Sequence, residues 1–249
     1  MWLLNARTRR LKLFISDTQV PRYAILSHTW GDDEVSFSDW RTLGPDAVAE
    51  KDGFTKIDYC CKQAVDDGLS WAWIDTCCID KTSSAELSEA INSMFRWYKN
   101  ASACYAYLSD VGTVASTDRA RIERQLAQSR WFTRGWTLQE LLAPQNLVLL
   151  SKDWVPMGTK AGLRDVLSSI TGIEDEFLCG GSLDEASVAK RMSWAATRQT
   201  SRVEDIAYCL MGIFDINMPL LYGEGMKAFR RLQEEIMRSN PRDHTLFAW

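Results

Sequence analysis

The sequence predicts an α/β fold, in which a parallel sheet is flanked by helices and a helical subdomain follows at the C-terminal end. Up to about residue 152, short apolar runs of strand length alternate with amphipathic helical segments. This alternation is typical of parallel strands joined by helical crossovers. Beyond residue 152 the alternation fades and the apolar periodicity becomes helical. We therefore expect an α/β core over residues 1–152 and a helical extension of the same domain over residues 153–249.

Four apolar runs have the length and composition of buried strands. The first contains Tyr-Ala-Ile-Leu and ends in a polar turn that begins at Ser27. The predicted strands lie at residues 22–27, 71–75, 103–108 and 146–150.

Helices separate these runs. The first is predicted over residues 55–67 and is closed by Gly68, a residue that favours helix ends. The clearest helix begins at Ser83, and Glu86 three residues later completes a capping-box pattern. Another helix contains Glu140. In the tail, helical patterns occupy residues 159–170, 187–196, 203–214 and 225–239.

Composition narrows the class of protein. The chain has 249 residues, of which 46% are hydrophobic and 25% are charged, which is enough for a well-buried core. The net charge is -4 and basic residues are scattered among acidic ones, so we do not expect a nucleic-acid partner. No segment resembles a secretory signal or a membrane span. We therefore expect a cytoplasmic protein with no membrane partner.

Cysteine and histidine content argues against two further classes. Seven cysteines fit reduced intracellular thiols better than a disulfide framework. The cysteines form no CxxC hooks and only two histidines are present, so no metal site is expected. A GxGxxG phosphate loop is also missing from the sequence, which disfavours a dehydrogenase.

Polar residues that follow the predicted strands are the first candidates for ligand contact, because ligands of such sheets bind beyond the carboxyl ends of the strands. For Ser27 and His28 the alternative is a turn that satisfies local backbone groups. For Asp75 and Asp80 the alternative is a cap near the helix that begins at Ser83. The full set is Ser27, His28, Trp30, Asp75, Asp80, Ser109 and Asp110.

Glu140 is the first catalytic candidate, since it is the one carboxylate within the aromatic and apolar stretch 129–144. Indole rings around an acid lower the local dielectric and raise its pKa, and they offer a flat wall to a planar ring or a sugar. The alternative is that the aromatic residues belong to the core and that Glu140 pairs with Arg130 or Arg134.

Ligand contacts in this region would come from two kinds of side chain. Trp30 or Trp136 could stack on a planar ring, and Arg130 or Arg134 could contact a diphosphate through a bidentate interaction. A hydrolase triad of Ser27, His28 and Asp75 is disfavoured, because adjacent residues of a strand point to opposite faces.

In the tail, a cluster of charged residues is predicted to form an ion-pair network between the helices and the sheet, with a structural role. Its members are Arg198, Arg202, Glu204 and Asp205. The apolar end, Phe247-Ala248-Trp249, leads us to expect that the chain is part of a longer protein.

Three blocks resemble the fungal heterokaryon-incompatibility (HET) domain: residues 23–31, residues 73–81 with 88–95, and residues 129–144. The tail over residues 193–225 is similar to the form that is fused to nucleotide-binding and repeat modules in fungal incompatibility receptors. The resemblance implies an N-terminal cell-death effector of a longer receptor chain, which acts when nonself recognition is signalled. Its C-terminal nucleotide-binding and repeat modules are then partners in the same chain.

The same blocks are more distantly similar to toll/interleukin-1 receptor (TIR) domains, which have a flavodoxin-like sheet. In TIR domains a Trp-Cys-x-x-Glu-Leu helix holds the glutamate used for NAD cleavage. Glu140 falls at that position, whereas Thr137 replaces the usual cysteine. The resemblance implies a TIR-like fold and an NAD glycohydrolase with catalytic Glu140, NAD as substrate and no tightly bound cofactor.

The resemblance also implies self-association, because TIR-like sites are often completed by a neighbouring copy. The expected nucleotide contacts are Ser27, His28, Trp30, Asp75, Arg130 and Trp136. The alternative function is a non-enzymatic self-associating signalling module that recruits other effectors, since a fold alone does not determine an activity.

Overall fold

A computed structural model describes residues 1–114 and 118–247, apart from the side chains of residues 44–46 and 247. Ala248 and Trp249 of the apolar end lie outside the described residues. The strands are β1 (Trp2–Asn5), β2 (Leu11–Leu13), β3 (Ala24–His28), β4 (Trp71–Trp73), β5 (Ala103–Tyr107), β6 (Leu147–Leu150) and β7 (Pro156–Thr159).

Helices connect these strands and form the C-terminal part. The α-helices are α1 (Phe37–Val48), α2 (Asp52–Asp66), α3 (Ser84–Asn100), α4 (Arg119–Gln128), α5 (Thr137–Leu142), α6 (Arg164–Thr171), α7 (Asp175–Leu178), α8 (Val188–Ser193), α9 (Asp205–Tyr208) and α10 (Lys227–Ser239). Short 3-10 helices are η1 (Asp17–Gln19), η2 (Arg130–Thr133), η3 (Leu183–Glu185), η4 (Met211–Ile213) and η5 (His244–Phe247).

The strands of the described residues form one mixed sheet in the order β2-β1-β4-β3-β5-β6-β7. The four central strands, β4, β3, β5 and β6, are parallel, and the pairs β1–β2, β1–β4 and β6–β7 are antiparallel. In chain order the parallel strands therefore run 2-1-3-4, which is the order of flavodoxin-like sheets. The predicted α/β class with a parallel, flavodoxin-like sheet core is confirmed.

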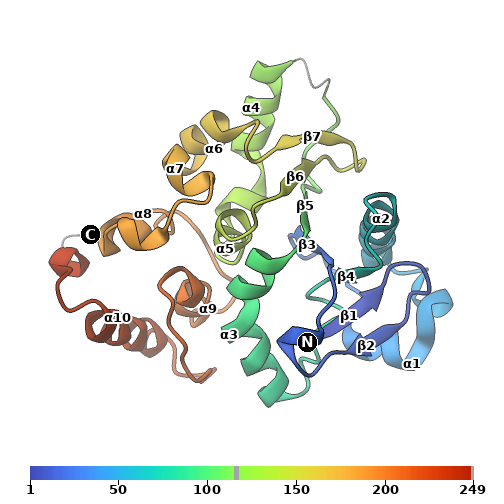
Figure 1. Ribbon diagram of the computed structural model, residues 1–249, viewed down its shortest axis with the longest axis horizontal. Coiled ribbons are helices and arrows are strands. Elements are labelled where there is room, and N and C mark those ends of the chain that lie inside the picture. Colours follow the sequence, from blue (N-terminus) through green and yellow to red (C-terminus); the bar gives the residue numbers. More distant parts are fainter. Residues whose placement is uncertain (115–117, 248–249) are drawn as a thin grey trace.

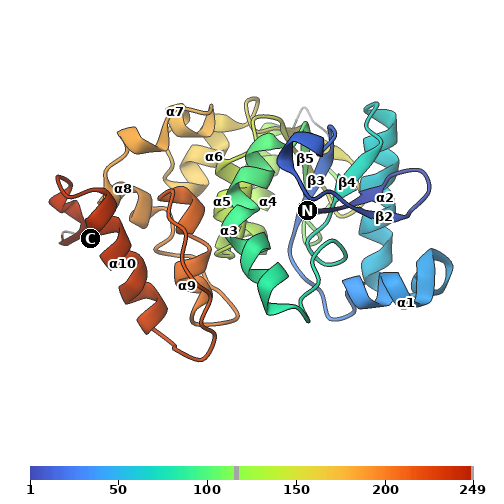
Figure 2. The ribbon, with the colours of Figure 1, turned by 60° about the horizontal axis from the view of Figure 1, so that its bottom comes forward.

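Helices cover both faces of the sheet. Helix α2 packs on β3, β4 and β5, whereas α5 packs on β3 from the other side and contacts α3. Figures 1 and 2 show α1 and α2 on one side of the sheet, with α3 and α5 on the opposite side. Helices α8, α9 and α10 lie beyond α3 and α5, away from the sheet (Figure 1). Because both faces are covered, β3 is buried along its whole length.

All four predicted strands are present, but the edges of the sheet were not predicted. The hairpin of β1 and β2 and the strand β7 add antiparallel edges. Strand β7 reads Pro-Met-Gly-Thr, a composition with weak strand propensity that is tolerated at an edge. It extends the sheet beyond residue 152, so the helix expected from residue 159 begins only at Arg164.

The predicted helix signals were correct in most places. Gly68 has a φ of 75° directly after α2, as a glycine at a helix end requires. The Ser83 hydroxyl accepts a hydrogen bond from the Glu86 backbone N–H at the start of α3. The capping box is incomplete, however, because the Glu86 carboxylate accepts from the Asp80 backbone N–H. The helix expected over 203–214 is divided into α9 and η4.

Gly212 lies where η4 of the C-terminal part packs closely against α3 of the α/β core. We predict that Gly212→Ala destabilises the protein. A Cβ at this position would clash with Cβ of Phe95 on α3. Because α3 and η4 would have to move apart, the free energy of unfolding is expected to fall by about 1–3 kcal/mol. Urea unfolding would measure this loss. Gly112→Ala is the control, since its Cβ would meet no atom closer than 3.8 Å; equal midpoints for the two variants would contradict the prediction.

Candidate active site

A cavity of about 360 Å³ opens beyond the carboxyl ends of β3 and β4. Its walls come from the segments after these two strands, from α3, from the region of α5 and from the tail around α9. In a flavodoxin-like sheet, ligands bind at this edge beside the switch in strand order. The location predicted from the strand ends is therefore where the structure places a cavity.

Glu140 lies in this cavity, on α5, with 7% of its surface exposed. Burial raises the pKa of Glu140 to about 8, and the charge of Asp75 acts in the same direction. The hydrogen bond from Ser27, the nearby hydroxyl of Tyr98 and the charge of Arg198 oppose this rise. Within the described residues, Glu140 forms no ion pair with Arg130 or Arg134.

Asp75 holds two other residues of the cavity in place. Nε2 of His28 lies 2.8 Å from Oδ1 of Asp75, and the Trp30 indole N–H donates to Oδ2 over 2.7 Å. Burial alone would raise the pKa of Asp75, but the interactions with His28, Lys81 and Trp30 lower it well below its usual range. Asp75 is therefore an anionic anchor for the side chains of His28 and Trp30. Neither aspartate caps α3, whose N-cap is Ser83; Asp80 accepts hydrogen bonds from Thr82 in the turn before the helix.

Cations lie close to aromatic rings in the walls of the cavity. Nζ of Lys81 lies 3.6 Å from the centroid of the Trp30 ring, and Trp30 is 51% exposed. The Arg202 guanidinium lies 4.4 Å from the centroid of the Tyr222 ring. Arg134 donates to the Ser201 hydroxyl over 2.9 Å. A ligand that combines planar rings with anionic groups matches these walls.

The structure brings together most of the predicted site residues. His28, Trp30, Asp75, Trp136 and Glu140 all line the cavity.

Ser27 and Arg130 lie elsewhere. Ser27 is fully buried and bonds to Glu140 behind the cavity wall. The Arg130 side chain is 68% exposed, and its Nε lies 3.7 Å from Oδ2 of Asp110. Asp110 also accepts from the Arg130 backbone N–H, which holds this residue beside the loop after β5. Of the two predicted arginines, only Arg134 lines the cavity.

The tail contributes a wall that the sequence did not predict. Arg202, Asp205 and Tyr222 line the cavity, although they lie far from Glu140 along the chain. Lys81 was also not predicted, and its position directly after Asp80 in the second block was the available signal.

The prediction that the charged residues of the tail form ion pairs with one another was wrong. Arg198 donates to the Arg134 carbonyl and to the Thr137 hydroxyl. Glu204 accepts from the backbone N–H groups of Gly223 and Gly225. These side chains therefore bond to backbone groups and a hydroxyl, and within residues 118–247 no ion pair joins the four charged residues of the cluster.

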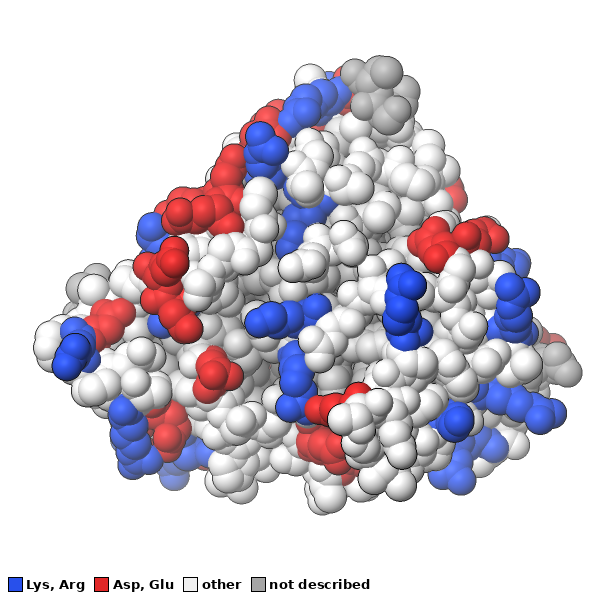
Figure 3. Space-filling view, in the orientation of Figure 1, with Lys and Arg blue, Asp and Glu red and all other residues white. Residues whose placement is uncertain are grey.

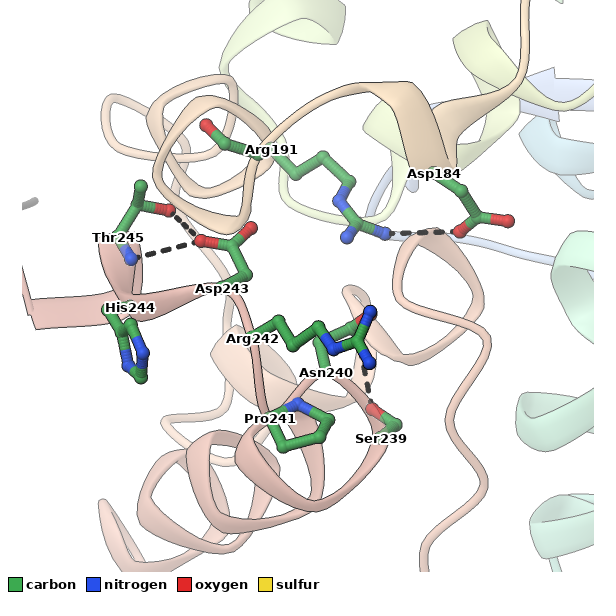
Figure 4. Close-up of a pocket in the computed structure, with 10 residues that line it drawn as sticks. Asp184, Arg191, Ser239, Asn240, Pro241, Arg242, Asp243, His244 and Thr245 are labelled. Carbon is green, nitrogen blue, oxygen red and sulfur yellow. Dashed lines mark hydrogen bonds and ion pairs between the residues drawn. The ribbon is translucent and has the colours of Figure 1, made fainter.

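A larger, more open hollow of about 750 Å³ lies between α8 and η5 (Figure 4). In this hollow Nη1 of Arg191 lies 3.7 Å from Oδ1 of Asp184, and the Thr245 hydroxyl donates a hydrogen bond to Asp243 (Figure 4). Among the side chains that the structure describes, its lining contains no Trp, Tyr or Phe, so these residues offer no broad ring for stacking. On the face shown in Figure 3, basic and acidic side chains are interspersed. The smaller cavity around Glu140 is therefore the candidate site.

Two features are absent from the described part of the chain. No helix among these residues is both long and apolar enough to cross a membrane. No group of three or more His, Cys, Asp or Glu residues in the same part is arranged to hold a metal ion.

Comparisons with known proteins match two regions of this chain. Residues 23–128 match the family described as heterokaryon incompatibility protein (HET), and residues 227–249 match a domain of unknown function, DUF8212. The vegetative incompatibility protein HET-E-1 of Podospora anserina is 47% identical over 225 residues. That similarity covers 88% of this chain but only 16% of the relative. No solved structure matches.

Proposed function

Because this chain carries a heterokaryon incompatibility (HET) domain, we propose that it is a cell-death effector of fungal nonself recognition that cleaves NAD at the nicotinamide–ribose bond after self-association. One observation carries the proposal: a buried carboxyl group, Glu140, lies in a cavity whose walls combine aromatic rings with cations. The similarity to an incompatibility protein supports the biological role. Under this proposal, the chain is part of a longer receptor, and the rest of that receptor relays the nonself signal.

Cleavage of this bond passes through a ribose with oxocarbenium character, as in glycoside hydrolysis. A carboxylate beside the sugar stabilises that positive charge more than it stabilises the ground state, which is the requirement for catalysis. Glu140 is suited to this role because protein surrounds it and little water screens its charge. Burial holds the pKa of Glu140 at about 8 in the free protein, and the positive charge of a bound pyridinium ring would favour ionisation of Glu140 when the substrate is present.

The remaining walls fit the other parts of a dinucleotide. Trp30, Trp136 and Tyr222 offer faces for the nicotinamide or adenine ring. Lys81, Arg134 and Arg202 supply positive charge for a diphosphate. His28 is held by Asp75 and faces the same space, where it could bond to a ribose hydroxyl.

The test is NAD consumption by the purified protein fused to an oligomerising scaffold, with products separated by mass. We expect release of nicotinamide in amounts equal to the NAD lost. If the folded and assembled protein leaves NAD intact but still triggers cell death, the second candidate, a self-associating module that recruits other effectors, replaces the enzyme.

Arg134→Ala is predicted to weaken substrate binding. Loss of one cation that contacts a diphosphate should raise KM about tenfold and change kcat little, because the contact is made in both ground and transition states. Steady-state kinetics would measure both constants. Arg130→Ala is the matched control, since Arg130 lies outside the cavity and should leave KM unchanged. An equal rise in KM for both variants would place the diphosphate elsewhere.

A further inference from the structure

Glu140 lies at the end of a chain of two hydrogen bonds that begins at Trp131. The Trp131 indole N–H donates to Oγ of Ser27 over 2.8 Å, and the Ser27 hydroxyl donates to Oε2 of Glu140. All three side chains are buried, with exposed fractions of 1% for Trp131, 0% for Ser27 and 7% for Glu140. Solvent therefore competes little for these bonds.

The chemistry of the three groups determines the direction of the chain. An indole N–H only donates, so Ser27 must accept from Trp131. The single proton of the Ser27 hydroxyl then needs an acceptor, and the only one within the described residues is Oε2 of Glu140. Oε2 is consequently held as an acceptor, whatever the protonation of Oε1.

Trp131 is itself held rigidly, on η2 next to the end of β5. Asp110 accepts from the Ser129 hydroxyl over 2.8 Å and from the Arg130 backbone N–H over 2.7 Å. The ring of Phe132 packs edge-on against Trp131, with 4.9 Å between the centroids. The indole N–H thus has little freedom to turn away from Ser27.

We propose that Trp131 and Ser27 are positioning residues that keep Oε2 of Glu140 engaged and so leave Oε1 as the oxygen that acts on the substrate. The two hydrogen bonds are present whatever the activity of the protein, whereas the role of Oε1 toward a substrate rests on the proposed function. Ser27 thereby changes from a predicted nucleotide contact to a partner of the catalytic carboxyl. Trp131, which the sequence presented as a possible core residue, acquires a role in the site.

Other groups also face Glu140 and have to remain unchanged in a test. They are Tyr98 of α3, Asp75 after β4, Arg198 after α8 and Cys104 of β5. None of them bonds to Trp131 or Ser27 among the described residues. Substitutions at Trp131 and Ser27 therefore act on Glu140 through one route.

The experiment measures the titration of the Glu140 carboxyl carbon by NMR in protein with ¹³C-labelled glutamate, assigned by its absence in Glu140→Gln. Ser27→Ala removes a hydrogen bond to the charged form, so the titration midpoint is expected to rise by about one pH unit. Trp131→Phe should raise it less, because Ser27 remains. In the double variant, Trp131→Phe should add nothing to Ser27→Ala, since its effect passes through Ser27.

Trp40→Phe is the matched control. Trp40 is also a buried indole that bonds to one acceptor, the Arg9 carbonyl at 3.0 Å, but it lies on α1. An unchanged midpoint in Trp131→Phe, equal to that in Trp40→Phe, would overturn the proposal, as would additive shifts in the double variant. Ser27→Cys, which keeps a weak donor of similar size, provides the same reading if Ser27→Ala does not fold.

The titration requires no turnover, so its outcome is separate from that of the proposed function. If NAD cleavage is also observed, a rise of one unit in the midpoint corresponds to about a tenfold lower kcat/KM at pH 7 for Ser27→Ala. If NAD is left intact while the midpoints shift as expected, the positioning of Glu140 by Trp131 and Ser27 stands and the proposed NAD cleavage fails.

Discussion

Glu140→Gln is expected to abolish NAD cleavage, with a loss of about 10²–10⁴-fold in kcat and a small change in KM. The amide has nearly the shape of the carboxyl group and can still accept from the Ser27 hydroxyl, so the cavity should keep its form. It cannot carry the negative charge that stabilises an oxocarbenium-like ribose. Single-turnover and steady-state rates of nicotinamide release would measure the loss.

Two controls make this result specific. Glu123→Gln changes an exposed glutamate on α4 and should keep the wild-type rate. Calorimetric titration with NAD should show that Glu140→Gln still binds the dinucleotide. If Glu140→Gln retains more than about a tenth of the wild-type kcat, another group supplies the stabilising charge and the assignment of Glu140 is wrong.

The second large effect expected is on stability, where Glu140→Gln should stabilise the protein at high pH. Burial raises the pKa of Glu140 from 4.5 to about 8 in the folded protein. A group with a raised pKa favours the folded state fully below its unfolded pKa, and this contribution is lost as pH rises through the folded pKa. The loss therefore develops between about pH 4.5 and pH 8.

The glutamine variant has no such proton to lose, so the two proteins should diverge as pH rises. At pH 8.5 the free energy of unfolding of Glu140→Gln should exceed that of the wild type by a few kcal/mol, because of the raised pKa of Glu140 in the folded protein. At pH 5 the difference should be small. Chemical denaturation at a series of pH values measures it, and a difference that stays constant from pH 5 to pH 8.5 would show that Glu140 is ionised throughout.

A catalytic carboxyl that lowers stability is the expected pattern for an active site. The buried ionisable group is retained in spite of its cost at high pH, whereas an ordinary core would replace it with an apolar side chain. Lys160 makes an informative contrast within the same region. It is also buried, but it donates to the carbonyls of Leu141, Leu142 and Pro144 at the end of α5, which is a structural role.

The central strands could be predicted because burial on both faces leaves a continuous apolar run in the sequence. Strand β3 is buried at every position, and its run was recognisable for that reason. Strand β7 carries Pro156 and Gly158, and it is a strand only because β6 offers it an edge. Its pairing partner, and not its own propensity, decides its structure.

Within the site, the sequence by itself determined the α/β class and the candidate Glu140, because apolar periodicity and an acid among indole rings are local patterns. Only the tertiary structure decided which groups meet that acid. Ser27 and Glu140 are 113 positions apart, and Trp131 and Ser27 are 104 apart, so no local pattern links them. The tertiary structure also decided that Arg134, and not Arg130, lines the cavity. The two arginines are close in sequence, but hydrogen bonds hold Arg130 beside Asp110 and Arg134 beside Ser201.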